Sequence, residues 1–142
     1  MIQHVFDHCL YFNTTALARR LEREWTLAFK PFELTPSQAF ILRVILSKPG
    51  LLQRELADEM GISRPTATRT LDGLAAKGLI ERRASERDGR EWSIFPTKSA
   101  RDLHQALDSA SGAVTRRLKK RLGEAAFVET VGKIRGVRAT LK

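Results

Sequence analysis

Apolar residues recur at helical spacing in the first part of the chain. Between residues 7 and 28, Leu10, Leu17, Leu21 and Trp25 are separated by seven, four and four positions. This spacing places the four side chains on one face of an α-helix. The pattern therefore predicts a long amphipathic helix whose apolar face packs against a partner.

A second helix is predicted to begin at Thr35. Threonine is a good helix cap, Pro36 suits the first helical position, and Gln38 stands where a capping box needs an amide. The helix is expected to end at Pro49-Gly50. The side chains expected to point inward are Phe40, Ile41, Val44 and Ile45.

Two shorter helices are predicted next, over about 53–60 and 63–77, with Gly78 as a C-terminal cap. The period then changes. Two short stretches rich in β-branched and aromatic residues, 79–83 and 91–95, flank the polar loop 84–90, which indicates a β-hairpin. Thr97 is expected to cap another long helix, Gly123 to break it, and a final helix to follow. The expected fold is mainly α with a small β-hairpin.

The stretch A-D-E-M-G-I-S-R-P-T-A-T-R, residues 57–69, is typical of a helix-turn-helix. Ala57 is small enough for two helices to cross closely, and Gly61 can adopt the positive φ that the turn needs. Ser63 can cap the second helix, and Pro65 falls in its first turn, where an amide hydrogen is dispensable.

Residues of that second helix divide between two faces. Ala67, Leu71 and Leu74 share one side, whereas Thr66 and Arg69 lie roughly opposite, with Thr68 on the flank. A small, hydroxylated and cationic face suits a helix that enters a DNA major groove. The alternative is a plain helical hairpin with a solvated face.

The hairpin that follows strengthens the DNA interpretation, because a helix-turn-helix with a two-stranded wing is a winged helix. Arginines in the loop 85–90 can reach a minor groove, where negative potential is concentrated. Asp88 would be a poor DNA contact, so we expect it to form an ion pair with a neighbouring arginine. An ordinary charged hairpin tip is the alternative.

Charge agrees with a nucleic-acid partner. The chain has 25 Lys and Arg against 16 Asp and Glu, a formal net charge of +9. Such a balance attracts polyanions, either nucleic acid or an acidic membrane surface. No apolar run long enough for a membrane span, no secretory signal and no familiar catalytic motif is found. One cysteine indicates a reducing cytoplasm, and no enzyme activity or cofactor is expected.

Three stretches resemble the MarR family of winged-helix regulators. They are L-T-P-S-Q-A-F-I-L-R-V-I, the long segment L-A-D-E-M-G-I-S-R-P-T-A-T-R-T-L-D-G-L-A-A-K-G-L-I-E-R, and the wing sequence R-D-G-R. With the flanking helices, the resemblance covers nearly the whole chain. Pro96 departs from the family pattern, which usually has a leucine before the threonine.

The resemblance implies one MarR-type domain over 1–142 that acts as a homodimer on a pseudo-palindromic DNA operator. Residues 1–34 and 98–142 would form dimerisation helices, and 35–97 the winged helix-turn-helix lobe. A repressor released by a small aromatic or anionic ligand is expected. The residues expected to face DNA are Gln53, Ser63, Arg64, Pro65, Thr66, Thr68, Arg69, Arg87, Asp88 and Arg90.

The effector site is only outlined by the sequence. Cys9, Tyr11, Phe12 and Phe40 are the candidate ligand-pocket residues, although aromatic residues at helical spacing are more often core. Family members that sense oxidants use a cysteine near this place, so a thiol-based sensor using Cys9 is an alternative. A nonspecific architectural nucleic-acid-binding protein is another.

Two further features have a plain and a functional interpretation. His4 and His8 are four residues apart, which allows a metal site on one helical turn but does not require one. The basic run 116–121 is expected to be a solvated face near a helix end rather than a DNA contact.

Overall fold

A computed structural model describes residues 3–142. The chain is mainly helical with one small antiparallel sheet, as the sequence predicts. Its elements are α1 (Leu10–Phe29), a short 3-10 helix (Lys30–Phe32), α2 (Pro36–Ser47), β1 (Leu51–Leu52), α3 (Gln53–Met60), α4 (Arg64–Ala76), β2 (Ile80–Ala84), β3 (Trp92–Pro96), α5 (Lys98–Leu122) and α6 (Glu124–Thr140).

Local capping chemistry sets most helix boundaries. The predicted capping box of α2 is present: Thr35 Oγ1 accepts from Gln38 N, and Gln38 Oε1 accepts from Thr35 N, both at 3.1 Å. Thr97 caps α5 by its hydroxyl alone, which accepts from Ala100 N. The first helix starts at Leu10 rather than Asp7, because Cys9 Sγ accepts from Phe12 N and caps it there.

The sheet has three strands, in the order β1-β3-β2. The hairpin pairs Ile80 with Pro96 and Ala84 with Trp92. The sequence pattern did not predict β1. This two-residue strand pairs with β3, where Leu51 lies opposite Ile94. Two residues are too few to show a strand period, so this strand is defined by its partner alone.

The core lies where α2 meets α4, α5 and the sheet. Ile41, Leu42, Ile45, Leu71 and Ile94 are completely buried there. Burying each of these side chains contributes about 1.5–3 kcal/mol to folding.

Phe40 and Val44 were expected to face inward with this set, and that expectation was wrong for Phe40 alone, because Val44 packs against the core. Phe40 is 36% exposed and meets Phe29 edge-on at 5.9 Å, and Val44 is only partly buried. Ala39, Leu42 and Leu46 take the inward positions of α2 instead, alongside Ile41 and Ile45.

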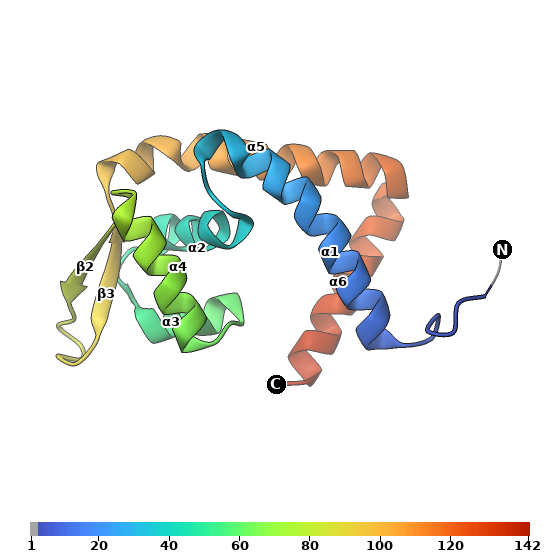
Figure 1. Cartoon of the computed structure of the whole chain (residues 1–142), viewed down its shortest axis with the longest axis horizontal. Coiled ribbons are helices and arrows are strands. Elements are labelled where there is room, and N and C mark those ends of the chain that lie inside the picture. The colour runs from blue at the N-terminus through green and yellow to red at the C-terminus, as the bar shows by residue number, and fades with distance from the viewer. Residues whose placement is uncertain (1–2) are drawn as a thin grey trace.

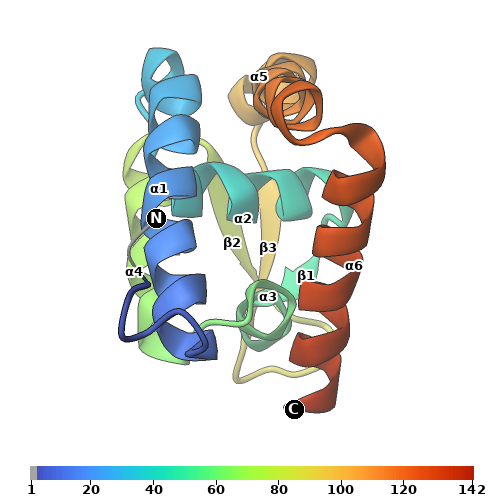
Figure 2. The ribbon, with the colours of Figure 1, turned by 90° about the vertical axis from the view of Figure 1, so that its right-hand side faces the viewer.

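The helices α1 and α6 extend away from this lobe. Figure 1 shows α5 running along the top, with α1 and α6 descending on the side opposite the hairpin. In Figure 2, turned by 90°, α1 and α6 lie in front of α2 and α3, on opposite sides of the view. In the described residues, no helix is both long and apolar enough to cross a membrane.

Candidate nucleic-acid interface

The turn between α3 and α4 has the geometry expected of a helix-turn-helix. Gly61 ends α3 with φ +65°, and Ile62 N donates to Ala57 O at 3.0 Å. Leu56 and Ala57 are buried on the α3 side, while Ala67, Leu71 and Leu74 are completely buried on α4. These contacts fix α4 against the lobe by one face and leave its other face outside.

The first turn of α4 is a polar cluster built around Thr66. Ser63 Oγ accepts from Thr66 N at 3.3 Å and lies 2.9 Å from Thr66 Oγ1. Arg69 Nη2 donates to the same threonine hydroxyl at 3.2 Å. Ser63, Arg64, Pro65 and Arg69 are exposed. The cluster orients a guanidinium on the outer face while leaving most of its five donors unused.

Gln53 and Thr68, both expected to face DNA, are joined to each other. Gln53 Nε2 donates to Thr68 Oγ1 at 2.7 Å, and Thr68 Oγ1 donates to Arg64 O at 3.0 Å. The bond links the start of α3 to the second turn of α4. Both side chains are half-buried. In the structure, these two side chains therefore hold α3 and α4 together.

Two ion pairs tie the wing loop to α3. Arg54 Nη1 lies 3.3 Å from Asp88 Oδ2, and Arg87 Nη2 bonds Glu55 Oε1. We call these four residues the wing clasp. Asp88 also accepts from Arg90 N at 3.0 Å, which closes the loop locally. The predicted ion pair of Asp88 is thus confirmed, but the expectation that a neighbouring arginine supplies it was wrong, because its partner Arg54 comes from α3.

The arginines of the wing clasp lower the pKa of one carboxyl group, that of Glu55. The hydrogen bond from Arg87 is the main cause of a lowered pKa at the Glu55 carboxyl, and the hydrogen bond from Leu52 N adds to it. Glu55 is therefore firmly anionic at neutral pH. Arg87, expected to meet DNA, has part of its guanidinium committed to this carboxylate.

The cations left on the outer surface come from both parts of the lobe. Over residues 3–142, no carboxylate lies within ion-pair distance of Arg64, Arg69 or Arg90, which belong to α4 and the wing loop. Figure 1 shows the wing loop and the start of α4 at the same end of the lobe, away from α5. One end of the lobe therefore carries an exposed cationic surface on two elements.

Arg54 is a member of this site that the sequence did not single out. Its partner Asp88 is 34 residues away in sequence, and Arg83, Arg87 and Arg90 are closer candidates along the chain. Only the packing of β3 beside β1 and α3 selects Arg54. The available signal was the unpaired charge of Asp88, which called for some arginine without identifying it.

The four candidate ligand residues are not brought together within one chain. Phe40 packs on Phe29, at the end of α1, whereas Phe12 lies near its start and stacks on His4 at 4.9 Å. Phe12 and Phe29 are separated by about 25 Å along the helix, at ~1.5 Å per residue. Tyr11 is 76% exposed. The prediction of one pocket from all four residues fails at the level of the single chain.

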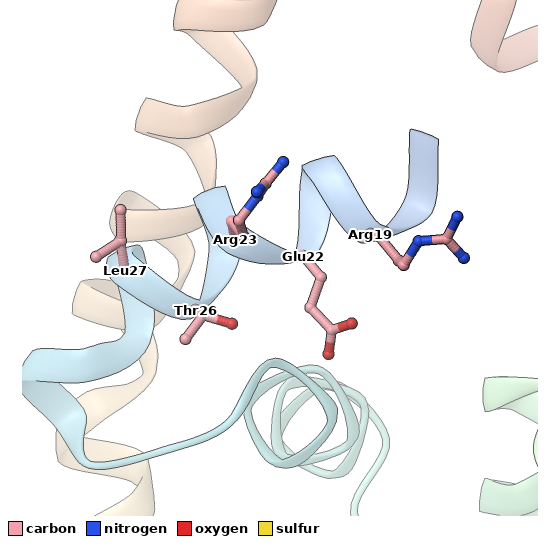
Figure 3. A pocket seen from close by; sticks show the side chains of 5 residues that line it. All are labelled: Arg19, Glu22, Arg23, Thr26 and Leu27. Carbon is pink, nitrogen blue, oxygen red and sulfur yellow. The ribbon is translucent and has the colours of Figure 1, made fainter. Parts of the chain in front are cut away.

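A different pocket, of about 470 Å³, lies on α1 and is shown in Figure 3. Glu22 and Thr26 point to the side of α2, and Arg23 points the opposite way. Arg19 and Leu27 complete the lining, so every lining residue belongs to α1. One helix cannot enclose a ligand.

Cys9 and the histidines lie at the start of α1. Cys9 is exposed and caps the helix. His4 accepts from Phe6 N through Nδ1 at 3.0 Å and stacks on Phe12. Among residues 3–142, no group of three or more His, Cys, Asp or Glu is arranged to hold a metal ion.

Comparison with known proteins gives a family match. Residues 32–91 match the model of the MarR family. The chain is 30% identical over 91 residues to an HTH-type transcriptional regulator, YybA, of Bacillus subtilis (strain 168). That alignment covers 64% of this chain and 61% of the relative, so the chain matches less than two thirds of the relative's length.

Solved structures share the fold over nearly the full chain. The transcriptional repressor CouR bound to a 23-mer DNA duplex has a TM-score of 0.87 and 23% identity, covering 97% of this chain and 99% of that one. The S. aureus MepR–DNA complex has a TM-score of 0.83 and 20% identity, covering 94% and 99%. The arrangement of α1 to α6 is therefore one that also occurs in proteins solved on DNA.

Proposed function

We propose that the chain is a transcriptional regulator of the MarR family and acts as a homodimeric, sequence-specific DNA-binding repressor. The similar proteins CouR and MepR were solved bound to DNA, which supports the same partner here. The proposal includes no catalytic activity. A regulator of this kind works in the cytoplasm, where its operator is accessible.

One observation carries the proposal: the start of α4 and the wing loop present exposed arginines at the same end of the lobe. Arg69 would read a base edge in the major groove, since a guanidinium matches the two acceptors of guanine. Arg90 would enter the adjacent minor groove. Ser63, Arg64 and Thr66 would contact phosphates and fix the register.

Exposed apolar side chains on α1 and α6 support the homodimer. Leu10 on α1 is 60% exposed, and Val128 on α6 is 58% exposed. An apolar cleft of about 580 Å³ lies between the two helices, lined by Leu17, Ile134 and Val137 among others. A monomer rarely exposes such a surface, and a second copy would cover it. We assign dimerisation to 1–34 and 98–142 and DNA reading to 35–97.

A small aromatic or anionic ligand would release the repressor. The pocket on α1 offers Arg19 for an anionic group and Leu27 for an apolar one. Because α1 supplies the whole lining, its second wall would have to come from the other copy. This location replaces the four-residue pocket expected from the sequence.

Selection from random duplexes tests the DNA-binding function. The protein would be incubated with a random-sequence library at physiological salt, and bound duplexes amplified and sequenced. We expect an inverted repeat whose half-sites lie about one helical turn, ~10 base pairs, apart. A library that stays unenriched after repeated rounds would contradict the proposal and favour a nonspecific architectural protein.

The exposure of Cys9 supports a second candidate, an oxidant-sensing regulator of the same fold. A buried thiol would be inert, but this one is open to solvent in the single chain. The test compares operator binding after peroxide and after thiol reductant, in wild type and Cys9→Ser. Reversible loss in wild type alone supports the sensor, and equal binding under both conditions rejects it.

A further inference from the structure

Trp92 is an exposed tryptophan at the first position of β3. Half of its surface, 50%, is accessible to solvent. A large aromatic side chain left in water forgoes the free energy that burial would give. Trp25, by comparison, is half-buried and donates its indole N–H to Ser111 Oγ at 3.0 Å. In residues 3–142, the indole of Trp92 has no such hydrogen-bond acceptor.

Strand register places Trp92 on the side of the sheet where α4 lies. Alternate residues of a strand share a face, so Trp92 lies on the face of Ile94, which is buried in the core. Arg82 is the cross-strand partner of Ile94 and shares that face as well. Arg82 Nη2 reaches Asp72 Oδ1 of α4 at 2.7 Å. Trp92 therefore shares the sheet face that packs against the helices of the lobe and does not lie on the outer face of the wing.

The same register sets Trp92 beside the start of α3. Leu52 of β1 pairs with Ser93 of β3. Gln53 follows Leu52, and Trp92 precedes Ser93, so the two residues adjoin the end of that ladder. Gln53 is bonded to Thr68 of α4 at 2.7 Å. Trp92 thus lies between the helix-turn-helix and the wing loop.

The backbone just before Trp92 is held by hydrogen bonds of Glu91. Ser85 N donates to Glu91 O, and Glu91 N donates to Asp88 O, both at 3.1 Å. Arg54 Nη1 lies 3.9 Å from Glu91 Oε2 and 3.3 Å from Asp88 Oδ2. The wing loop therefore fixes the backbone of the residue directly before Trp92. A side chain on such a base loses little backbone entropy when a partner binds it.

We propose that Trp92 contacts the sugar–phosphate strand between the two grooves that the protein enters. This inference rests on the proposed function. With α4 in a major groove and the wing loop in the adjacent minor groove, the surface between them faces the backbone that separates those grooves. An indole N–H only donates hydrogen bonds, and phosphate oxygens are the acceptors there. Its ring would cover the apolar face of a deoxyribose.

A phosphate contact has a distinct signature, because every sequence offers the same acceptor. Trp92→Phe keeps an aromatic ring and removes the N–H donor. We expect its affinity to fall about ten- to hundredfold, the loss of one hydrogen bond to a charged acceptor. The loss should be equal for the selected operator and a scrambled duplex. The slope of log affinity against log salt should stay unchanged, since no cation is removed.

Fluorescence offers a direct test, because the chain has two tryptophans. Trp25→Phe leaves Trp92 as the sole tryptophan emitter, and Trp92→Phe leaves Trp25 as the matched control. Each variant would be titrated with unlabelled operator duplex while acrylamide quenching is measured. We expect the duplex to protect Trp92 from the quencher and leave Trp25 as accessible as before. If Trp25→Phe fails to fold, the difference between wild type and Trp92→Phe gives the same quantity.

Binding is followed in parallel by the anisotropy of a labelled duplex. This measurement distinguishes a failure of the proposed DNA-binding function from a failure of the Trp92 contact. Absence of binding by wild type would overturn the proposed function itself. Full binding with Trp92 still open to acrylamide, and with unchanged affinity in Trp92→Phe, would overturn the inference alone. Loss of preference between operator and scrambled DNA in Trp92→Phe would mean base reading and would contradict the phosphate contact. Protection that rises with protein concentration in the absence of DNA would assign Trp92 to an interface between copies and would likewise overturn the inference.

Discussion

Arg69 is the residue to which we assign base reading. It is exposed on α4, and its guanidinium is oriented by Thr66 Oγ1 at 3.2 Å. We expect Arg69→Ala to weaken operator binding by about 1–3 kcal/mol and to relax preference at one base pair. The measurement is a fluorescence anisotropy titration against operator and scrambled duplexes at one salt concentration.

Arg121→Ala serves as the matched control for Arg69→Ala. It removes the same charge from the exposed end of α5, far from the wing loop. The control should leave the preference between operator and scrambled duplex intact. Equal behaviour of the two variants would show that the docking of α4 is wrong.

Arg90 is expected to contribute affinity with little sequence information. Its backbone is fixed by Asp88, and its side chain is exposed at the wing tip. Arg90→Ala should weaken binding to all duplexes and lower the salt slope by about 1. Titrations at several salt concentrations give that slope. An unchanged slope together with a loss of operator preference would mean that Arg90 reads bases.

Glu55 makes the stability of the lobe depend on pH. Its pKa is lowered in the folded chain, chiefly by the hydrogen bond from Arg87. Its contribution is therefore fully present above the unfolded-state pKa near 4.5 and is lost as pH falls through the lower folded-state pKa. Below that value both states bind the proton, and the contribution vanishes.

We expect Glu55→Gln to be less stable than wild type at neutral pH and the gap to close in acid. Urea unfolding from about pH 6 down to about pH 3 measures the difference in free energy of unfolding. Glu59→Gln is the control, since Glu59 pairs with Lys48 outside the clasp. A gap between wild type and Glu55→Gln that stays constant over this range would contradict the assignment.

At the scale of single elements, Gly61 determines how α3 passes into α4. Its φ of +65° is costly for other residues, and an added Cβ would meet Arg138 Nη2 at 3.6 Å, an ordinary contact. Gly61→Ala should therefore lose about 1–2 kcal/mol of stability through its backbone alone. Chemical denaturation measures it, with Gly89→Ala as the control because a Cβ at Gly89 has nothing within 4 Å. Equal stability of the two variants would refute this account of the turn.

Elements with local determinants were predictable from the sequence. Thr35 and Gln38 form their capping box within four residues, and Gly61 needs only its own φ. The short strand β1 was missed because Leu51 and Leu52 become a strand only when β3 lies beside them. The burial of Phe40 was predicted wrongly because helical spacing cannot say how far around α2 the core extends.

The candidate site likewise has parts that are predictable from local sequence and parts that depend on the tertiary fold. Residues of the α4 surface follow from one helical period, so Thr66 and Arg69 could be grouped from their spacing alone. The clasp joins residues 34 and 32 positions apart in sequence, and several arginines compete for each carboxylate. Its pairing depends on the tertiary fold. For the same reason the ligand residues near Phe12 could not be related to Phe40, since no local pattern links α1 with α2.

At the scale of the whole molecule, we expect the helices α1 and α6 to form the interface between two copies of the chain. Ile134 lines the apolar cleft between them and is 41% exposed in the single chain. We expect Ile134→Glu to weaken dimerisation strongly, because a buried unpaired carboxylate is costly. Sedimentation equilibrium measures the association constant. Circular dichroism checks that the lobe remains folded.

Glu129→Gln is the matched control for the dimer prediction. It changes the charge of α6 by one unit, in the opposite direction, at an exposed residue paired with Lys133. This variant should remain dimeric. A wild-type protein that stays monomeric at tens of micromolar would contradict the proposed assembly, and an Ile134→Glu protein as dimeric as wild type would exclude this cleft from the interface.

The most direct test of the whole account is the affinity ratio between the selected operator and a scrambled duplex for the wild-type protein. Both titrations must use the same physiological salt, because counterion release alone gives a basic protein of charge +9 substantial affinity for any DNA. A sequence-specific regulator should prefer its operator by about 10³-fold or more. A ratio near unity at every salt concentration would mean that the protein binds DNA by charge alone, and the assignment of α4 as a reading helix would fall.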